Sequence, residues 1–444
     1  MNVAIGRKIA RVVTSPRLRE ARISLSRLGR RLTDHVRLHY FHQVDDPYSH
    51  LTAQVLSTLV QRYRIELMVH LVPAAASNDS ADQAQVQARA RRDATALARH
   101  YQLEAPLRTN DLGEVFDEQP TAELIRLAMQ ALTSAVVQDR FALIAPDISR
   151  ALWQNHLAPL TVFASNTDPG APAAALRLGA NKQKRLGLDQ AASFYFASEW
   201  YLGIERLHYL EERLRAEGLA TEPLQALIVP PTALPLTPEP AMTSPGQPVP
   251  QLHFFGSFRS PYSYLALHRA KTVAEHYGAL LQLHFVIPLA MHGLTIPRAR
   301  RLYIMRDAKR EADRWQIPFG KITDPIGAPV ERGLAVLHRA IAQGCGVEFA
   351  LSFFQGAWGE GINAGSDRGL NTIAARAGMD AASVKAALAD DSWRASVQSD
   401  QELLASLGHW DVPCLRVNDG PVLFGHERFW LLEQELAALR RQLA

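Results

Sequence analysis

The sequence predicts two α/β domains in tandem, each with a mixed β-sheet and an all-helical insertion. Three observations lead to this prediction. A strand-turn-helix pattern, "LHYFHQVDDPYSHL" at 38–51, returns as "LHFFGSFRSPYSYL" at 252–265, an offset of 214 residues. Residues 229–250 are rich in proline, threonine and serine, which is typical of a linker. The length of 444 residues allows two or three domains with proper cores.

The repeat extends over most of both halves. At the same offset Tyr63 meets Tyr277, His70 meets His284, and "RDATALARHYQL" meets "RDAKREADRWQI" without a gap. Near the ends "GIERLHYLEERL" parallels "GHERFWLLEQEL". A repeat of this length indicates a duplicated domain. We therefore expect a basic helical arm, a first domain, a Pro-rich linker and a second domain, at 1–35, 36–228, 229–250 and 251–444.

The order of elements is clearest in the second half. An apolar strand at 252–257 leads through Ser260 and Pro261 into a helix that ends near Tyr277, and a second strand follows at 279–288. Two strands joined by one crossover helix form a right-handed unit and are parallel. Residues 413–425, "PCLRVNDGPVLFG", predict a hairpin. Apolar spacing predicts helices at 297–316, 328–343, 347–358, 367–378, 381–389 and about 427–443.

Composition excludes several classes of protein. Hydrophobic residues make up 47%, charged residues 21%, and the formal charge is only +4, as in ordinary globular proteins. There is no apolar run long enough to span a bilayer and no signal peptide, so we expect no membrane insertion and a cytoplasmic location. Cys345 and Cys414 are the only cysteines, which argues against a disulfide framework, a thiol zinc site and a dithiol redox pair. We expect no metal site.

Residues 1–35 carry much of the positive charge, with nine Arg or Lys against two acids. The pattern predicts a solvated helical arm packed on the first domain, in preference to a membrane-surface or nucleic-acid arm. No basic stripe with interleaved aromatic residues follows, so nucleic acid is not an expected partner.

The second half resembles the branch of the thioredoxin fold that holds kappa-class glutathione transferases and 2-hydroxychromene-2-carboxylate isomerases, relatives of the DsbA-type disulfide oxidoreductases. The matching segments cover almost all of 251–442 in family order: "FRSPYSYLA", "YIMRDAKREADRWQIPF", "AWGEGI", "WDVPCLRV" and "FGHERFWLLEQEL". The resemblance implies two tandem thioredoxin-like (DsbA-like) domains and glutathione as the cofactor. Ser260 stands where redox members place the first cysteine of C-x-x-C.

Ser260 precedes Pro261 at the first turn of the predicted helix. Backbone N–H groups lack partners there, and the positive end of the helix dipole favours an anion such as a thiolate. The resemblance implies that the thiol is that of glutathione and that Ser260 donates a hydrogen bond to its sulfur. The alternative is that Ser260 is an N-cap alone, a role that serine often has.

The resemblance also implies a cis peptide between Val412 and Pro413, with the Val412 N–H and C=O pairing with the glutathione backbone. A trans turn into an edge strand is the alternative. Cys414 follows, where relatives commonly carry Thr or Ser. It is interpreted as a small buried residue in preference to a reactive thiol.

Glu427 and Arg428 match the acid and arginine that relatives use on the γ-glutamyl group, the acid for its ammonium and the arginine for a carboxylate. The alternative for the acid is ordinary helix capping. Asp307 and Arg310, one helical turn apart, are interpreted as an i,i+3 pair that supports a helix and not as a catalytic couple.

Arg300 falls where kappa-class members have a lysine that binds glutathione. Arg298 and Arg301 remain alternatives, as does a solvated cluster. An asparagine contact expected upstream is replaced by Met291 or shifted to His292, so one glutathione contact of the family has no clear counterpart.

The first half departs from the family at both signatures. Asp46 replaces the active-site serine, and a carboxylate there disfavours a thiolate. Ala191 or Ala192 stands where the second half has Pro413. We therefore expect a catalytically silent first domain that packs against the second as an internal pseudo-dimer, the linker raising their effective concentration.

The resemblance implies an isomerase in which the glutathione thiolate adds reversibly to an unsaturated, aromatic-derived acid, a bond rotates, and the thiolate leaves. The alternatives are a kappa-class-like glutathione transferase, a DsbA-family thiol oxidoreductase, or a non-enzymatic scaffold. Ser260 and Ser263 occupy both cysteine positions, which disfavours dithiol exchange. The sequence does not identify the substrate.

Overall fold

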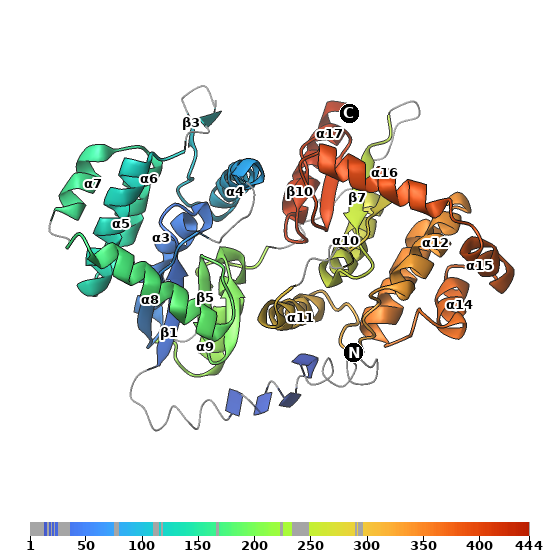
Figure 1. The fold of residues 1–444 in the computed structure, drawn as a ribbon, viewed down its shortest axis with the longest axis horizontal. Helices are drawn as coiled ribbons and strands as arrows, with labels where there is room; N and C mark the ends of the chain where they lie inside the picture. The colour runs from blue at the N-terminus through green and yellow to red at the C-terminus, as the bar shows by residue number, and fades with distance from the viewer. Residues whose placement is uncertain are drawn as a thin grey trace. The chain divides into compact units, whose positions relative to one another are not determined.

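A computed structural model describes the chain at residues 13–15, 17–18, 20–21, 23–24, 36–74, 80–109, 115–116, 119–165, 168–222, 225–232, 248–288, 291 and 296–443. The chain divides into two compact units (Figure 1). One is the N-terminal unit, Glu20–Pro231, and the other, the C-terminal unit, combines Thr232–Ala444 with Met1–Arg19. The division falls within the predicted linker, most of which, 233–247, lies outside the described residues.

The C-terminal unit is built on a four-stranded mixed sheet of order β8-β7-β9-β10. Its strands are β7 (Gln251–Gly256), β8 (Leu280–Phe285), β9 (Cys414–Val417) and β10 (Leu423–Phe424). β7 and β8 run parallel, joined by α10 (Pro261–Tyr277), and β9 pairs antiparallel with both β7 and β10. These pairings confirm the predicted crossover unit and the hairpin.

The sheet has two different faces because side chains alternate along a strand. Leu252 and Phe254 of β7 point into the main core with Phe258 and Tyr264, and all four are fully buried. On the opposite face, Phe255 and Cys414 join a smaller cluster with Leu404 of α16 (Trp393–Ser406). Each face is therefore covered, which is required of a sheet that carries apolar residues on both sides.

The helical insertion occupies the predicted region with one addition. Figure 1 shows most of the helices after residue 327 grouped at one side of the sheet and the helix at 298–314 apart from them, with α16 returning toward the sheet. A five-residue π-helical segment, Gln355–Gly359, extends α13, and α16 itself was not predicted. The helices of this unit are α11 (Arg298–Arg314), α12 (Ala328–Ala342), α13 (Gly346–Phe354), α14 (Asp367–Arg376), α15 (Ala381–Leu388), α16 and α17 (Phe429–Leu443).

The N-terminal unit has the same sheet order, β2-β1-β5-β6, in equivalent strands. Its strands are β1 (Arg37–His42), β2 (Glu66–Leu71), β5 (Ser193–Phe196) and β6 (Glu199–Leu202), with a short separate hairpin of β3 (Arg108–Thr109) and β4 (Val115–Phe116). Its helices are α3 (Pro47–Arg62), α4 (Ser80–Tyr101), α5 (Ala122–Val137), α6 (Phe141–Trp153), α7 (Leu157–Ala164), α8 (Ala171–Leu186), a 3-10 turn at Ile204–Arg206, and α9 (Leu207–Ala216).

The sequence offset is also the structural register. Arg37 pairs with Glu66 in β1–β2, and Gln251 pairs with Leu280 in β7–β8, each shifted by the same 214 residues. Hydrogen bonds repeat as well: Tyr48 to Asp93 (2.7 Å) corresponds to Tyr262 to Asp307 (3.0 Å), and Tyr63 to Glu211 (2.9 Å) to Tyr277 to Glu433 (3.0 Å). The two units thus share their sheet topology and two tyrosine–carboxylate hydrogen bonds.

Most of the basic arm at 1–35 lies outside the described residues. Thr14 is described, and its hydroxyl donates to the Gly320 carbonyl oxygen (3.3 Å) within the C-terminal unit. The expectation that the arm packs on the first domain is therefore wrong at this residue.

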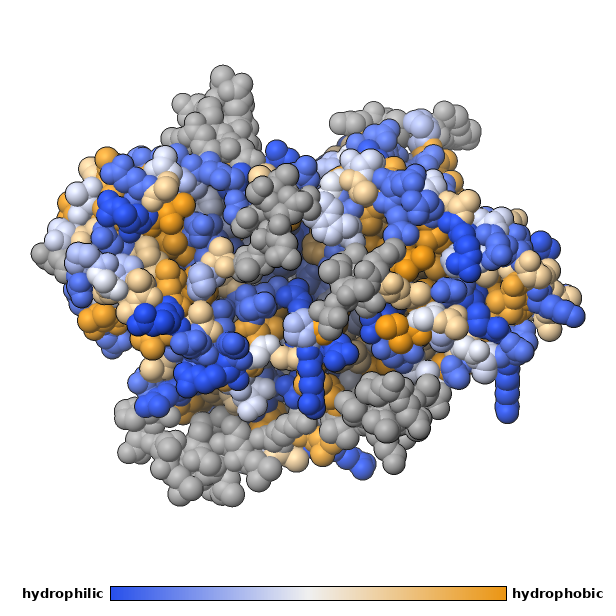
Figure 2. Space-filling model, viewed as in Figure 1, coloured by the Kyte–Doolittle hydropathy of each residue, from blue (hydrophilic) through white to orange (hydrophobic). Residues whose placement is uncertain are grey.

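The surface of each unit is largely polar. Figure 2 shows hydrophilic residues across the visible face, interrupted by apolar patches. In the N-terminal unit, exposed apolar side chains lie on the insertion helices: Val137, Leu143, Leu157, Val162 and Leu178. Over the described ranges, no helix is both long enough and apolar enough to cross a bilayer.

Candidate functional site

Ser260 begins α10 at the end of the turn that follows β7. It is half-buried, and its hydroxyl accepts a hydrogen bond from the Ser263 N–H (3.1 Å). Its own N–H donates to the Ser257 carbonyl oxygen (2.9 Å), which closes the turn, and Pro261 occupies the first helical position. Ser260 is thus an N-cap whose hydroxyl proton is not used by the cap, because the oxygen acts there as the acceptor.

Strand pairing brings the Val412–Pro413 peptide to this turn. Phe255 of β7 pairs with Cys414, the first residue of β9, so the residues that precede β9 continue along the end of β7, where the turn to Ser260 starts. The Val412–Pro413 bond is cis, as predicted. The Gly425 N–H donates to the Pro413 carbonyl oxygen (2.9 Å), which ties the segment before α17 to the same place.

Asp411 is a residue of this site that the sequence analysis missed. Its carboxylate accepts a hydrogen bond from the Val412 N–H (2.8 Å), so the amide expected to pair with glutathione already has a partner. Although Asp411 is exposed at the surface, the surrounding protein raises the pKa of its carboxyl by desolvation, and the Val412 N–H and the charge of Arg300 oppose that rise. The feature of the sequence that could have indicated this role is an acidic residue directly before Val412 and Pro413.

Arg300, in the first turn of α11, is the arginine that this arrangement brings near the site. It is half-buried and close enough to Asp411 for their charges to interact, whereas Arg298 and Arg301 are exposed. Met291 is half-buried, and His292 lies outside the described residues.

Glu427 and Arg428 lie just before α17, which begins at Phe429 and not at Glu427 as predicted. The Glu427 side chain is 22% exposed, and its Oε2 lies 3.3 Å from His426 Nδ1. Arg428 is only 5% exposed. Gly425 has φ +97°, and a Cβ at this position would lie 2.6 Å from Glu427 Oε2, so the glycine leaves room for the carboxylate.

His426 joins these residues to α10 and α11. Its ring stacks on Tyr262, with centroids 4.7 Å apart and planes at 10°, and its Nε2 lies 3.5 Å from Glu311 Oε2. The Tyr262 hydroxyl donates to Asp307 (3.0 Å), which also faces Arg310 at 3.6 Å. Asp307 therefore supports the first turn of α10 as well as its own helix. The only feature of the sequence that could have indicated the role of His426 is a histidine within "FGHERF".

The helical insertion holds the β7–α10 turn from the other side. Arg259 makes a two-pronged ion pair with Asp324 (3.0 and 3.2 Å), and the Trp358 indole N–H donates to the Phe258 carbonyl oxygen (3.1 Å). Ser257 is 2% exposed, and its hydroxyl has no hydrogen-bond partner among the described residues. A buried hydroxyl without a partner is unusual and leaves one polar group unused within the turn.

Cys414 is fully buried, with its Sγ 3.2 Å from the Asp411 carbonyl oxygen. This confirms the interpretation of Cys414 as a small buried residue. In the part of the chain that the structure describes, no group of three or more His, Cys, Asp or Glu side chains is arranged to hold a metal ion.

The N-terminal unit keeps the helix cap and the strand register of this site and changes its chemistry. Asp46 caps α3, accepting from the Ser49 N–H (2.7 Å), with φ and ψ close to those of Ser260, and Pro47 follows. Phe41 pairs with Ser193, so Ala192 is the residue equivalent to Pro413. Desolvation raises the pKa of Asp46 to about 6.

Residues 251–437 match the family model of the DSBA-like thioredoxin domain. A 2-hydroxychromene-2-carboxylate isomerase of Pseudomonas putida is 25% identical over 199 residues, which cover 43% of this chain and 96% of that protein. A solved 2-hydroxychromene-2-carboxylate isomerase aligns with 21% identity and a TM-score of 0.38, covering 43% of this chain and 96% of that one. The cytosolic disulfide reductase DsbM of Pseudomonas aeruginosa, solved with GSH, aligns with 20% identity and a TM-score of 0.33, covering 44% and 98%. The predicted resemblance to DsbA-like proteins and chromene-carboxylate isomerases is thereby confirmed.

The raised pKa of Asp46 predicts that its ionised carboxylate destabilises the N-terminal unit at neutral and higher pH. Its pKa of about 6 lies above the usual 3.8, so its contribution to stability is greatest below pH 4 and is lost as pH rises through 6. Asp46→Asn keeps a capping side chain without the charge and is expected to stabilise the unit by up to about 3 kcal/mol at pH 8, with no difference at pH 4. Urea titration followed by hydrogen exchange of residues 36–72 measures this.

The matched control is Asp380→Asn, at an exposed N-cap of the C-terminal unit whose pKa is lowered by the Ser383 N–H. This variant is expected to lose stability, or to be neutral, at pH 8. An Asp46→Asn variant that is no more stable than the wild type at pH 8 would contradict the destabilisation assigned to the ionised Asp46 carboxylate.

Proposed function

Because residues 251–437 carry a DSBA-like thioredoxin domain, we propose that the C-terminal unit binds glutathione at the start of α10 and acts as a glutathione-dependent isomerase of the 2-hydroxychromene-2-carboxylate isomerase type. The observation that carries the proposal is the Ser260 hydroxyl, which caps α10 as an acceptor and retains its proton for a sulfur. The substrate would be a small, aromatic-derived acid.

The donor set at this turn fits a thiolate peptide. The Ser260 hydroxyl and the positive end of α10 stabilise negative charge on sulfur, and Arg300 adds a cation nearby. The partly exposed Glu427 carboxylate suits an ammonium group. Glutathione, when bound, supplies a nucleophilic thiolate of a kind that the chain, with only Cys345 and buried Cys414, lacks at this turn.

Each protein residue has a defined part in this proposal. Ser260 holds its proton on the hydroxyl oxygen and directs it toward the sulfur, which favours the thiolate and lowers the pKa of the thiol. Val412 offers a strand-like edge for the peptide backbone once Asp411 has released its N–H. Pro413 forms the wall beside Val412, and Pro261 holds the first turn of α10. Arg428 is buried, so its guanidinium can contact only a part of the ligand that comes close to it.

In this proposal the turn that carries Ser260 also orients the substrate. The Arg259–Asp324 ion pair and the Trp358 hydrogen bond hold the insertion against this turn. Ser257 and Phe258 are buried, whereas Ser260 is half-buried and is the residue of the turn that the ligand would approach.

The N-terminal unit is proposed to be silent toward glutathione. Asp46 puts a carboxyl where Ser260 stands, and Ala192 replaces Pro413. We attribute the two units to duplication of one domain and propose that they pair as an internal pseudo-dimer. A glutathione-dependent activity fits a cytoplasmic location, because glutathione is the thiol that keeps protein cysteines reduced there.

Ser260→Ala in the full chain tests the proposed function. Wild-type protein is expected to bind glutathione with micromolar-to-millimolar affinity by calorimetry. Loss of the hydroxyl donor is expected to raise the pKa of the bound thiol by about one unit, or about 1.4 kcal/mol, in an ultraviolet thiolate titration. Asp46→Ala, the equivalent change in the other unit, is the control and leaves both quantities unchanged. No binding by the wild type, or an identical titration in Ser260→Ala, would reduce Ser260 to a helix cap.

Asp411→Ala is expected to strengthen glutathione binding by about three- to tenfold, or roughly 1 kcal/mol. The substitution frees the Val412 N–H from the bond that it makes to Asp411 and releases the charge of Arg300. Asp419→Ala, which removes an equally negative but fully exposed side chain, controls for net charge. Weaker binding by Asp411→Ala would mean that the carboxylate itself holds the ligand.

A further inference from the structure

A chain of three ionisable side chains crosses the face of the C-terminal sheet that α16 covers. His284 of β8 places Nδ1 2.7 Å from Asp400 Oδ1 of α16, and its Nε2 lies 2.9 Å from Nδ1 of His253 in β7. The second oxygen of Asp400 accepts the Phe285 N–H (2.9 Å), which fixes the carboxylate. The proposed glutathione site uses none of these residues.

The hydrogen bonds assign the tautomers. A carboxylate only accepts, so His284 carries its proton on Nδ1 and accepts with Nε2. His253 then donates from Nδ1, and its remaining nitrogen, Nε2, has a lone pair. The chain Asp400–His284–His253 therefore presents a hydrogen-bond acceptor at its far end.

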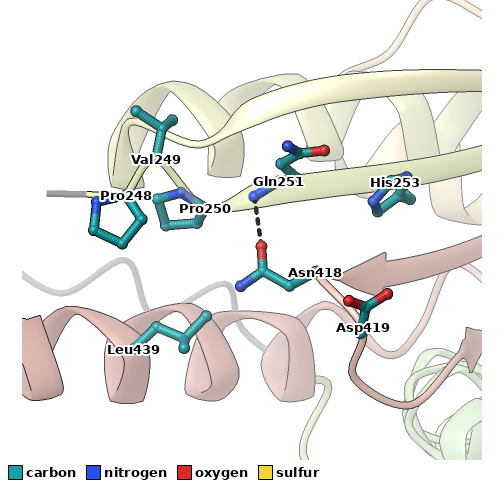
Figure 3. Close-up of a pocket in the computed structure, with 8 residues that line it drawn as sticks. All are labelled: Pro248, Val249, Pro250, Gln251, His253, Asn418, Asp419 and Leu439. Carbon is teal, nitrogen blue, oxygen red and sulfur yellow. Dashed lines mark hydrogen bonds between the residues drawn. The ribbon is translucent and has the colours of Figure 1, made fainter.

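His253 lines a hollow of about 580 Å³, within the roughly 300–1,000 Å³ range of small-molecule sites. Figure 3 shows it between the start of β7 and the turn after β9, with Leu439 of α17 on the remaining side. It lies at the opposite end of β7 from the turn that carries Ser260. Its lining residues are Pro248, Val249, Pro250, Gln251, His253, Asn418, Asp419 and Leu439.

The chemistry of the lining limits what the hollow can take. Two prolines, Val249 and Leu439 give it flat apolar walls, and the Asn418 side-chain oxygen is already used by the Gln251 N–H (2.8 Å; Figure 3). Asp419 is paired with Arg416 at 3.1 Å, so neither a strong cation nor an anion is favoured. His253 Nε2 is the acceptor that the histidine pair offers, beside the side-chain amide of Gln251.

The groups around His253 favour the neutral form of its ring. Desolvation lowers the pKa of His253, His284 and Arg416 lower it further, and Asp419 opposes them. Asp400 is the charged partner of His284 from α16. His253 Nε2 is thus an acceptor at neutral pH and becomes a donor only when the His253 ring takes up a proton.

The N-terminal unit supplies a natural comparison. His39 and His70 form the same contact at 2.9 Å, but among the described residues no carboxylate hydrogen-bonds to His70, and Lys182 and Arg185 lie near it instead. The histidine pair belongs to the shared scaffold, and the carboxylate that sets its tautomers occurs in the C-terminal unit.

We propose that this hollow is a second ligand site that takes a small phenol, whose ring lies on the apolar walls and whose hydroxyl donates to His253 Nε2. A neutral aromatic alcohol can donate to this acceptor while its ring lies on the apolar side chains, whereas an ether of the same shape offers it no proton. Asp400 and His284 are positioning residues that act through His253.

Binding of phenol and of anisole to the full chain, followed by calorimetry or ligand-observed NMR, tests the site. Phenol is expected to bind at least tenfold more tightly than anisole. His253→Phe, which keeps a ring and loses the acceptor, is expected to abolish this preference. His39→Phe is the matched control in the other unit and leaves the preference intact.

Asp400→Asn provides a second variant that preserves side-chain shape. Its amide can donate to His284 Nδ1, which reverses the chain and turns His253 Nε2 into a donor, so the preference for phenol is expected to vanish while glutathione binding is retained. Equal binding of phenol and anisole by the wild type, no saturable binding of phenol, or an unchanged preference in a folded His253→Phe or Asp400→Asn variant would overturn the proposal.

Discussion

The antiparallel pairing of β9 with β7 is the constraint on which the candidate site depends. Because Phe255 pairs with Cys414, the Val412–Pro413 peptide meets the turn that leads to Ser260, although the two are about 150 residues apart in sequence. The same pairing places Arg416 beside His253 at the other end of the strand. A shift of the β7–β9 pairing by one residue would turn Cys414 and Arg416 to the opposite face of the sheet. It would therefore disrupt both the contact at the Ser260 turn and the contact at His253.

One scaffold therefore carries two different sets of charges. The registers, the tyrosine–carboxylate bonds and the histidine pair recur in the N-terminal unit, so they belong to the fold. The differences are local. The N-terminal unit has the Asp46 carboxyl, with a raised pKa, where the C-terminal unit has the neutral hydroxyl of Ser260. A lysine lies near His70, whereas the Asp400 carboxylate contacts the equivalent His284. Each difference changes the chemistry of the position while the strand register and the helix cap stay the same.

Local and repeated patterns were predictable from the sequence. The offset of 214 residues predicted the strand registers, and the Ser-Pro sequence predicted the N-cap, because both depend on neighbouring residues. α16 escaped prediction because "WRASVQSDQELLAS" is mostly polar and only Trp393, Val397 and Leu404 are buried. Asp400 was missed with it. The roles of Asp411 and His426, and the burial of Arg428, depend on tertiary packing that no spacing rule encodes.

The central claim is that a glutathione thiolate rests at the start of α10. A crystal structure of the full chain with glutathione measures this most directly. The account predicts the sulfur within hydrogen-bond distance of Ser260 Oγ, the peptide alongside Val412, and Asp411 turned away from the Val412 N–H. Glutathione bound at Asp46 of the N-terminal unit, or at the start of α10 with its sulfur away from Ser260, would contradict it.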